Sequence, residues 1–341
     1  MTGVKVRVDP ADGRSMAMTV RAEVRATRKE ADPRQVRILG LTVMSALFLV
    51  LGIVRGFPFD REQVLFWVVV FLFVGTLGSE RGGARILRDW LPFGVLLVIY
   101  DLSRGVADDL GMPIHFEPQL RADEILFFGE VPTVWLQDRF YEPSVQWWEA
   151  LLSLTYVSHF IVPFLAAAVL WFRERDAWIA YVRRFITLSF LGVATYVVFP
   201  AAPPWLAAER GLIDPIARTT TRGWEVLGLD IAGRMLAKGQ ASVNEVAAVP
   251  SLHAAFAFLV TVFFWNRWRP ALRPVLALYS VAMVLALVFS GEHYVVDALL
   301  GWLYVLAIHA GWTRWERRRA EDSPQLVHAP LESTVGASSL P

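Results

Sequence analysis

SGEHYVVD, residues 290–297, is a short polar segment between the apolar runs 273–290 and 294–312. PSLHAA, residues 250–255, stands at the start of the preceding apolar run, 250–267. Histidine and aspartate are costly to place at the end of a membrane helix, so they indicate a functional site. His293 and Asp297 are four residues apart, which puts them on one helix face within reach of each other. This contact would fix the tautomer of His293 and leave its other ring nitrogen as a nucleophile. His253 is then available as a general acid.

The composition is that of a membrane protein. The 341-residue chain has a mean hydropathy of +0.43 and 55% hydrophobic residues, against about 45–50% in soluble domains. Its 14 Trp and 22 Phe suit lipid contact. The net charge of +1 gives no indication of a nucleic-acid partner, and the lack of cysteine excludes disulfides and thiolate metal sites. The charged first 35 residues contain no apolar core of a signal peptide.

Apolar runs of membrane-spanning length, roughly 17–25 residues, recur along the chain. They predict an all-α polytopic membrane protein with about eight transmembrane helices, at 36–54, 62–78, 88–106, 148–171, 184–200, 250–267, 273–290 and 294–312. We expect residues 88–313 to form a six-helix catalytic core, preceded by two additional helices in 36–87. The polar ends, 1–35 and 314–341, are predicted to be disordered cytoplasmic tails.

The arginines predict the orientation of these helices. If the N-terminus is cytoplasmic, the short cytoplasmic segments 79–89, 172–184 and 267–273 and the C-terminal tail are all arginine-rich, as the positive-inside rule requires. Both termini are therefore predicted to be cytoplasmic. The long outer segments are nearer to neutral, and 119–141 is expected to lie at the interface as an amphipathic element. The residues that this orientation brings to one extracytoplasmic depth are His253, His293, Asp297, Asp101 and Arg104.

Two helices that begin at His253 and His293 would direct free N–H groups and positive dipole ends at an anion, for which phosphate is the natural candidate. Ser251, Arg104 and Asp101 are the predicted phosphate-binding residues, with Arg104 binding bidentately. In the predicted mechanism His293 forms a phosphohistidine, and Asp297 stabilises the imidazolium. His253 protonates the departing oxygen and then activates an alcohol or water. No metal or cofactor is expected, because the histidines and donors supply the charge stabilisation.

The two segments resemble the second and third signature motifs of the type 2 phosphatidic acid phosphatase superfamily. The matching residues are Pro250-Ser251-x-His253 and His293-Tyr294-x-x-Asp297-x-x-x-Gly301. The resemblance covers about residues 88–312. It implies that His253 is the proton donor, His293 the nucleophile and Asp297 the orienting carboxylate.

The chain departs from the phosphatase branch, which has an arginine where Leu287 stands and a Lys…Arg-Pro motif that is not matched here. In this it resembles the inositol phosphorylceramide synthase and sphingomyelin synthase branch. Three further segments resemble an inositolphosphotransferase-like bacterial group: Tyr100-Asp101-x-x-Arg104, His159-x-x-x-Pro163 and Pro200-Ala-Ala-Pro-Pro-Trp205. The resemblance suggests replacement phosphate-binding cations, namely Arg104, Arg222, Arg234 and Lys238.

The leading prediction is a membrane enzyme that transfers or hydrolyses a phosphoryl or phospho-head group, of inositol phosphate type among others, on a lipid phosphate or phospholipid. A simple lipid phosphate phosphatase is the alternative within this class. A transporter or scaffold is the alternative outside it, although a transporter should carry polar residues at mid-membrane depth. A haloperoxidase-like oxidase is a further alternative. His159 either faces the site or bonds a neighbouring helix, and Asp101 and Arg104 either bind phosphate or form a structural ion pair.

Overall fold

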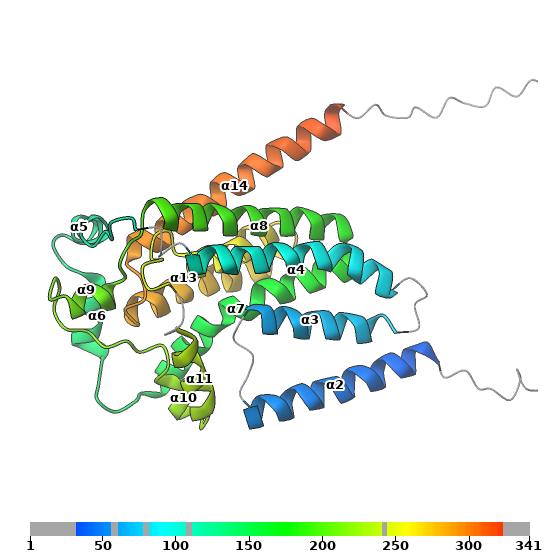
Figure 1. Cartoon of the computed structure of the whole chain (residues 1–341), viewed down its shortest axis with the longest axis horizontal. Coiled ribbons are helices and arrows are strands. Elements are labelled where there is room, and N and C mark those ends of the chain that lie inside the picture. Colours follow the sequence, from blue (N-terminus) through cyan, green and yellow to red (C-terminus); the bar gives the residue numbers. More distant parts are fainter. Residues whose placement is uncertain (1–31, 56–60, 78–81, 107–110, 241–243, 323–341) are drawn as a thin grey trace, which may run out of the picture.

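The computed structural model describes residues 32–55, 61–77, 82–106, 111–240 and 244–322, and all regular structure in them is helical (Figure 1). Eight of these helices correspond to the predicted spans: α2 (Pro33–Arg55), α3 (Arg61–Gly75), α4 (Gly82–Val106), α7 (Trp147–Arg173), α8 (Arg175–Val198), α12 (Leu252–Phe264), α13 (Arg273–Phe289) and α14 (Val295–Asp322). The predicted all-α polytopic membrane fold is confirmed. The predictions for residues 1–31 and 323–341 lie outside the described residues.

Among the described residues, five segments are long and apolar enough to cross a membrane: 34–52, 147–173, 175–198, 270–289 and 295–322. α3 and α12 are apolar but shorter, with 15 and 13 residues. α4 has 25 residues but carries charges in its first turns. α8 begins nine residues before the predicted span, and α14 continues as a helix into residues that were predicted to form the disordered tail.

α12 lies at the centre of the bundle, in contact with α7, α8, α13 and α14. Ten of its 13 residues are buried, because its sequence is apolar on every side. Aromatic rings fill the surrounding core, for example Phe256 stacked on Phe185 with centroids 4.4 Å apart. The outward faces of α2, α4 and α13 also carry large exposed apolar side chains, such as Leu39, Leu91 and Leu278. A bundle that is apolar both inside and outside suits a lipid environment.

At one end of the bundle, here called the outer end, the connecting segments fold into short helices (Figure 1). These are α5 (Glu117–Leu126), α6 (Pro132–Phe140), α9 (Pro204–Glu209), α10 (Gly223–Val226) and α11 (Asp230–Gln240). The predicted amphipathic segment 119–141 thus forms two helices, separated by a turn in which Gly129 has φ +98°. Isolated β-bridges join Ala201 to His115 and to Ala247 and hold the outer segments together.

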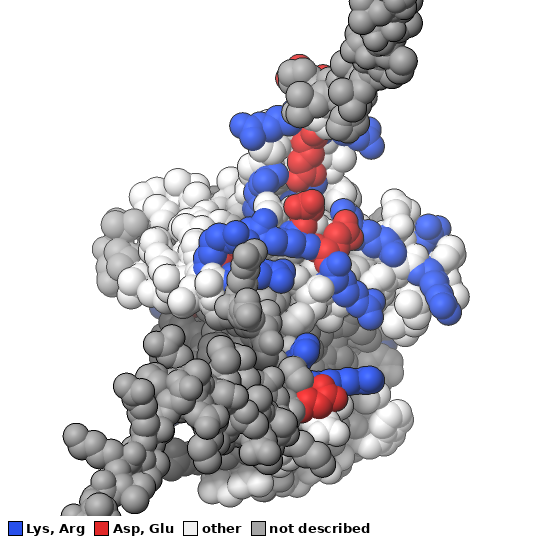
Figure 2. All heavy atoms as spheres, turned by 90° about the vertical axis from the view of Figure 1, so that its right-hand side faces the viewer, with Lys and Arg blue, Asp and Glu red and all other residues white. Residues whose placement is uncertain are grey.

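The opposite end, here called the inner end, is rich in arginine, as the view onto it shows (Figure 2). The buried Arg184 donates to Glu316 at 2.7 Å and to Thr313 at 3.1 Å, which joins α8 to α14. Arg175 pairs with Asp89 of α4 at 2.6 Å. The first and last described helices, α2 and α14, have their chain ends here (Figure 1). The arginine-rich segments that were predicted to be cytoplasmic therefore lie together at this end of the bundle.

Candidate active site

The loop between α13 and α14, residues 290–294, is held by backbone contacts that orient His293. Gly291 adopts φ +76°, a conformation that glycine accepts without strain. The N–H groups of Glu292 and His293 both point back to the carbonyl of Leu287, at 3.0 and 3.3 Å. This turn ends α13 and directs the His293 side chain into the protein, where the residue is only 4% exposed.

The N-terminus of α14 is capped from two sides. Asp297 accepts a hydrogen bond from the Tyr294 N–H at 2.9 Å. Asp123 of α5 accepts from the N–H groups of Val295 and Val296 at 2.9 and 2.8 Å. Burial raises the pKa of the Asp123 carboxyl to about 6, against the two backbone donors that lower it. An outer helix therefore fixes the start of the helix that carries Asp297.

Gly301 brings the start of α12 against α14. A Cβ atom at this position would lie 2.5 Å from the Ser251 carbonyl oxygen, so only glycine permits this approach. The Ser251 N–H donates to the Asp297 carbonyl at 2.9 Å, and its fully buried hydroxyl caps α12 by accepting from the Ala254 N–H. The glycine of the third motif therefore sets the distance between the two histidines.

The predicted constellation is assembled by these contacts. His293 Nδ1 lies 3.4 Å from Asp297 Oδ2, and His293 Nε2 lies 3.2 Å from His253 Nδ1. Asp297 is fully buried. A carboxylate, an imidazole and a second imidazole thus form one chain across the N-termini of α14 and α12, in which each group can orient or exchange a proton with the next.

Side chains of α7 hold His253 from the other side. The Tyr156 ring stacks on His253 with centroids 5.3 Å apart, and the His159 ring meets it edge-on at 4.0 Å. His159 Nδ1 is hydrogen-bonded to the Tyr156 carbonyl within its own helix. His159 therefore contacts His253, and the hydrogen bond of its Nδ1 lies within its own helix rather than to a neighbouring helix.

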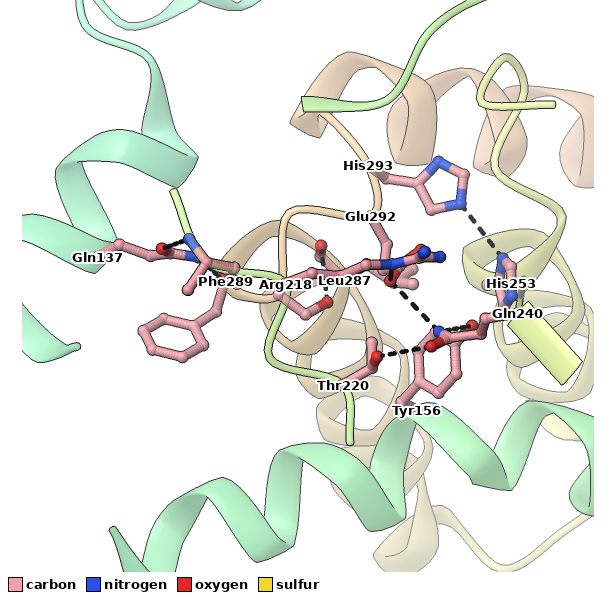
Figure 3. Close-up of polar contacts among 12 residues, drawn as sticks. Gln137, Tyr156, Arg218, Thr220, Gln240, His253, Leu287, Phe289, Glu292 and His293 are labelled. Carbon is pink, nitrogen blue, oxygen red and sulfur yellow. Dashed lines mark hydrogen bonds and ion pairs between the residues drawn. The ribbon is translucent and has the colours of Figure 1, made fainter. Parts of the chain in front are cut away.

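A polar cluster that the sequence analysis did not identify adjoins the histidines (Figure 3). Arg218 binds Glu292 bidentately, at 2.6 and 3.0 Å, and its guanidinium lies 4.6 Å from the centre of the Trp205 ring. Gln240 donates to the Tyr156 hydroxyl at 3.1 Å and to Glu292 at 3.3 Å. The Thr220 hydroxyl donates to Oε1 of the Gln240 side-chain amide at 3.1 Å. We call Tyr156, Thr220, Gln240, Glu292 and Arg218 the polar cluster.

The phosphate-binding residues that were predicted from the sequence lie elsewhere or have other partners. Arg222 is engaged by the Glu142 carbonyl at 2.7 Å and by Glu149 at 3.3 Å. Arg234 and Lys238 are exposed on α11. Asp101 is half-buried near the end of α4, and the side chain of Arg104 is outside the described part of the chain. Their proposed contact with phosphate stays a prediction.

Leu287, which replaces the arginine of the phosphatase branch, is fully buried in an apolar cluster with Ala254 and Met283. A cation at this position would be surrounded by apolar side chains. In the part of the chain that the structure describes, no group of three or more His, Asp or Glu side chains is arranged to hold a metal ion.

An apolar cavity of about 490 Å³ lies between α6, α13 and α14. Among the described residues that line it, Glu130 is the one that is charged, and the others have apolar side chains, such as Trp135, Leu285 and Trp302. Val288 and Val295, which also line it, flank the loop that carries His293. The volume falls within the range of about 300–1,000 Å³ typical of ligand pockets.

Fold and site together define a class of protein: a helical membrane enzyme in which a carboxylate-oriented imidazole faces a second imidazole. A family model described as the PAP2 superfamily matches residues 121–311, more than half of the chain. The chain therefore belongs to the PAP2 superfamily, as the two motifs predicted.

Two curated relatives narrow this further. The phosphoinositol dihydroceramide synthase of Bacteroides thetaiotaomicron is 28% identical over 295 residues, which cover 80% of this chain and 92% of the relative. The inositol phosphorylceramide synthase catalytic subunit of Saccharomyces cerevisiae is 26% identical over 264 residues, or 74% of this chain and 64% of that relative. No solved structure matches the chain. The predicted inositolphosphotransferase-like branch and the class, a membrane enzyme that transfers or hydrolyses phosphoryl groups on lipids, are confirmed.

Proposed function

We propose that this enzyme transfers a phospho-head group of the inositol phosphate type from a phospholipid to the hydroxyl of a ceramide-type lipid. The observation that carries the proposal is the chain from Asp297 through His293 to His253. The names of the two relatives supply the head group and the acceptor. The simple phosphatase is not favoured, because both relatives are named as synthases.

In the first step His293 Nε2 attacks phosphorus in line. A P–N bond forms as the P–O bond to the diacylglycerol oxygen breaks, and His253 gives its proton to that oxygen. The contact of 3.4 Å between His293 Nδ1 and Asp297 supports this assignment, because a proton held on Nδ1 leaves the Nε2 lone pair free to attack. His293 Nε2 and His253 Nδ1, which lie 3.2 Å apart, move away from each other to admit the phosphoryl group.

In the second step the acceptor hydroxyl gives its proton to His253 and attacks phosphorus. The new P–O bond forms as the P–N bond to His293 breaks, which restores both imidazoles. Water would complete the same step as a hydrolysis. The burial of His293 and Asp297, at 4% and 0% exposure, favours an alcohol delivered from the membrane over bulk water.

Arg218 is proposed as the phosphate-binding cation in place of the residues missing from the family motifs. It reaches the site from the segment before α10 and is held beside His293 by Glu292 and by the Trp205 ring. Its guanidinium points toward the side of the two histidines (Figure 3). The N-terminal end of α12, which begins at Leu252, adds positive potential.

The site is proposed to face the extracytoplasmic side, with both chain termini in the cytoplasm. The arginine-rich inner end supports this orientation, because cytoplasmic segments carry the excess of positive charge. The apolar cavity beside the catalytic loop offers room for part of a hydrocarbon chain.

The test is an assay of purified protein in mixed micelles with phosphatidylinositol as donor and with or without ceramide. A new inositol-containing sphingolipid, absent with His293→Ala, is the expected product. A second arm supplies phosphatidic acid and measures inorganic phosphate. Release of phosphate without head-group transfer would establish a phosphatase instead, and turnover that survives in His293→Ala would contradict the site itself.

A further inference from the structure

Three polar side chains of the polar cluster are buried beside the two histidines. Thr220, Gln240 and Glu292 are 3%, 8% and 8% exposed. They come from three separate segments: the stretch before α10, the end of α11 and the loop before α14. Polar groups brought together from distant segments beside a reactive site are costly to bury, so their placement calls for a function.

The side chains of the polar cluster are connected by consecutive hydrogen bonds. Thr220 donates to Gln240, and Gln240 donates to both Tyr156 and Glu292 (Figure 3). Hydroxyl groups at its ends, on Thr220 and Tyr156, can act either as donor or as acceptor. A ligand with several hydroxyl groups can replace these mutual bonds one for one, since each of its hydroxyls also donates and accepts.

Charge argues for a neutral ligand group. The single carboxylate, Glu292, is already neutralised by the bidentate Arg218. The cluster is therefore unsuited to an ammonium group, which would compete with a guanidinium that is already in place. Neutral hydroxyl groups gain hydrogen bonds here without disturbing that ion pair.

We propose that Tyr156, Thr220, Gln240 and Glu292 form a binding site for the hydroxyl groups of a polyol head group while its phosphate is transferred between lipids. The proposal rests on the proposed function and adds the residues that select the head group. In the two-step reaction the head group stays on the enzyme while diacylglycerol leaves and the acceptor enters. A site for it must therefore lie against the protein, beside the histidines, as Tyr156 does by stacking on His253.

The experiment compares Thr220→Val and Gln240→Leu in the full-length enzyme, because both changes keep approximate size and remove polar atoms. Thr187→Val is the matched control: like Thr220, Thr187 donates a hydrogen bond through its hydroxyl, to the Arg183 carbonyl at 2.8 Å, but it lies on α8, away from the site. Rates are measured with phosphatidylinositol and, separately, with phosphatidylglycerol, whose head group has fewer hydroxyls. The KM for ceramide is measured alongside.

We expect kcat/KM for phosphatidylinositol to fall about 5-fold in Thr220→Val and about 30-fold in Gln240→Leu, as one or several hydrogen bonds are lost. The preference for phosphatidylinositol over phosphatidylglycerol should fall in parallel, with the KM for ceramide unchanged. Equal losses for both donors would show that the two residues only support the fold and would overturn the polyol site. A wild-type enzyme that transfers no inositol phosphate would overturn the proposed function and the polyol site together.

Discussion

Replacing Gly301 by alanine places a methyl group at the contact that sets the distance between the two histidines. The new Cβ atom would lie 2.5 Å from the Ser251 carbonyl oxygen and 3.3 Å from the Ala255 Cβ, whereas ordinary contact begins near 3.4 Å. The first turn of α12 and the α14 backbone must therefore separate by about 0.9 Å. This shift also weakens the hydrogen bond from the Ser251 N–H to the Asp297 carbonyl.

The consequence should be larger for catalysis than for folding. A misplacement of about 1 Å between reacting groups costs roughly 100-fold in rate, while overpacking a core costs about 1–3 kcal/mol of stability. We therefore expect Gly301→Ala to fold with a lowered Tm and to lose about 100-fold in kcat. Initial rates of head-group transfer and thermal unfolding in the same detergent separate the two effects.

Gly311→Ala is the control on the same helix. No atom lies within 4 Å of the Cβ position at Gly311, so this variant should keep wild-type activity. It should also gain about 1 kcal/mol of helix stability. If Gly301→Ala stays within threefold of wild-type kcat, the reasoning that links helix contact to the distance between the histidines is refuted.

Asp297→Asn should lower kcat by about 1,000-fold or more with little change in donor KM, because an amide no longer holds the His293 tautomer; a loss under tenfold in single-turnover assays argues against that role. Arg218→Gln should lower kcat/KM for the donor about 100-fold, and Arg218→Lys should recover only part because lysine cannot bind bidentately. Full activity of the Gln variant would remove Arg218 from the site. Asp123→Asn tests the cap of α14: the folded pKa of about 6 exceeds the ordinary 3.8, so the proton is held more tightly in the folded state. The stability of the wild type relative to Asp123→Asn should fall by up to about 3 kcal/mol as the pH rises from 4 to 7, and a pH-independent difference in Tm would contradict it.

The helical register made the central constellation predictable. His293 and Asp297 are four residues apart, and although His293 lies in the loop just before α14 begins at Val295, the two side chains meet as their spacing predicted. The approach of His253 to His293 was also expected, because both histidines lie next to helix starts that were predicted at one depth. These inferences depend on local spacing and on helix direction, which a sequence displays directly.

Arg218 was missed because its pairing is not local. It is separated from Glu292 by 74 residues and lies in a segment, 206–248, that has no apolar period from which its path could be inferred. Thr220 and Gln240 are polar residues among many others there. Their burial results from how the outer segments are joined, for example by the bridges of Ala201 to His115 and Ala247.

The start of α8 was predicted nine residues too late, at residue 184 instead of Arg175, for a different physical reason. Arg175, Arg183 and Arg184 lower the hydropathy of its first turns, which makes them look like a loop. Each is paired with a carboxylate in the structure, Arg175 with Asp89, and Arg183 and Arg184 with the shared Glu316. Such ion pairs allow the charged first turns of α8 to be helical at the edge of the bundle. A hydropathy average over the sequence cannot detect them, because their partners are distant in the chain.

The central claim is that His293 carries the head group covalently between donor and acceptor. The direct measurement is to mix the enzyme with phosphatidylinositol labelled in its phosphate, without ceramide, and to map the label by peptide mass spectrometry. The account predicts an acid-labile, base-stable adduct on His293 that disappears when ceramide is added. Transfer at the normal rate with no adduct, or an adduct on another residue that persists in His293→Ala, would contradict it.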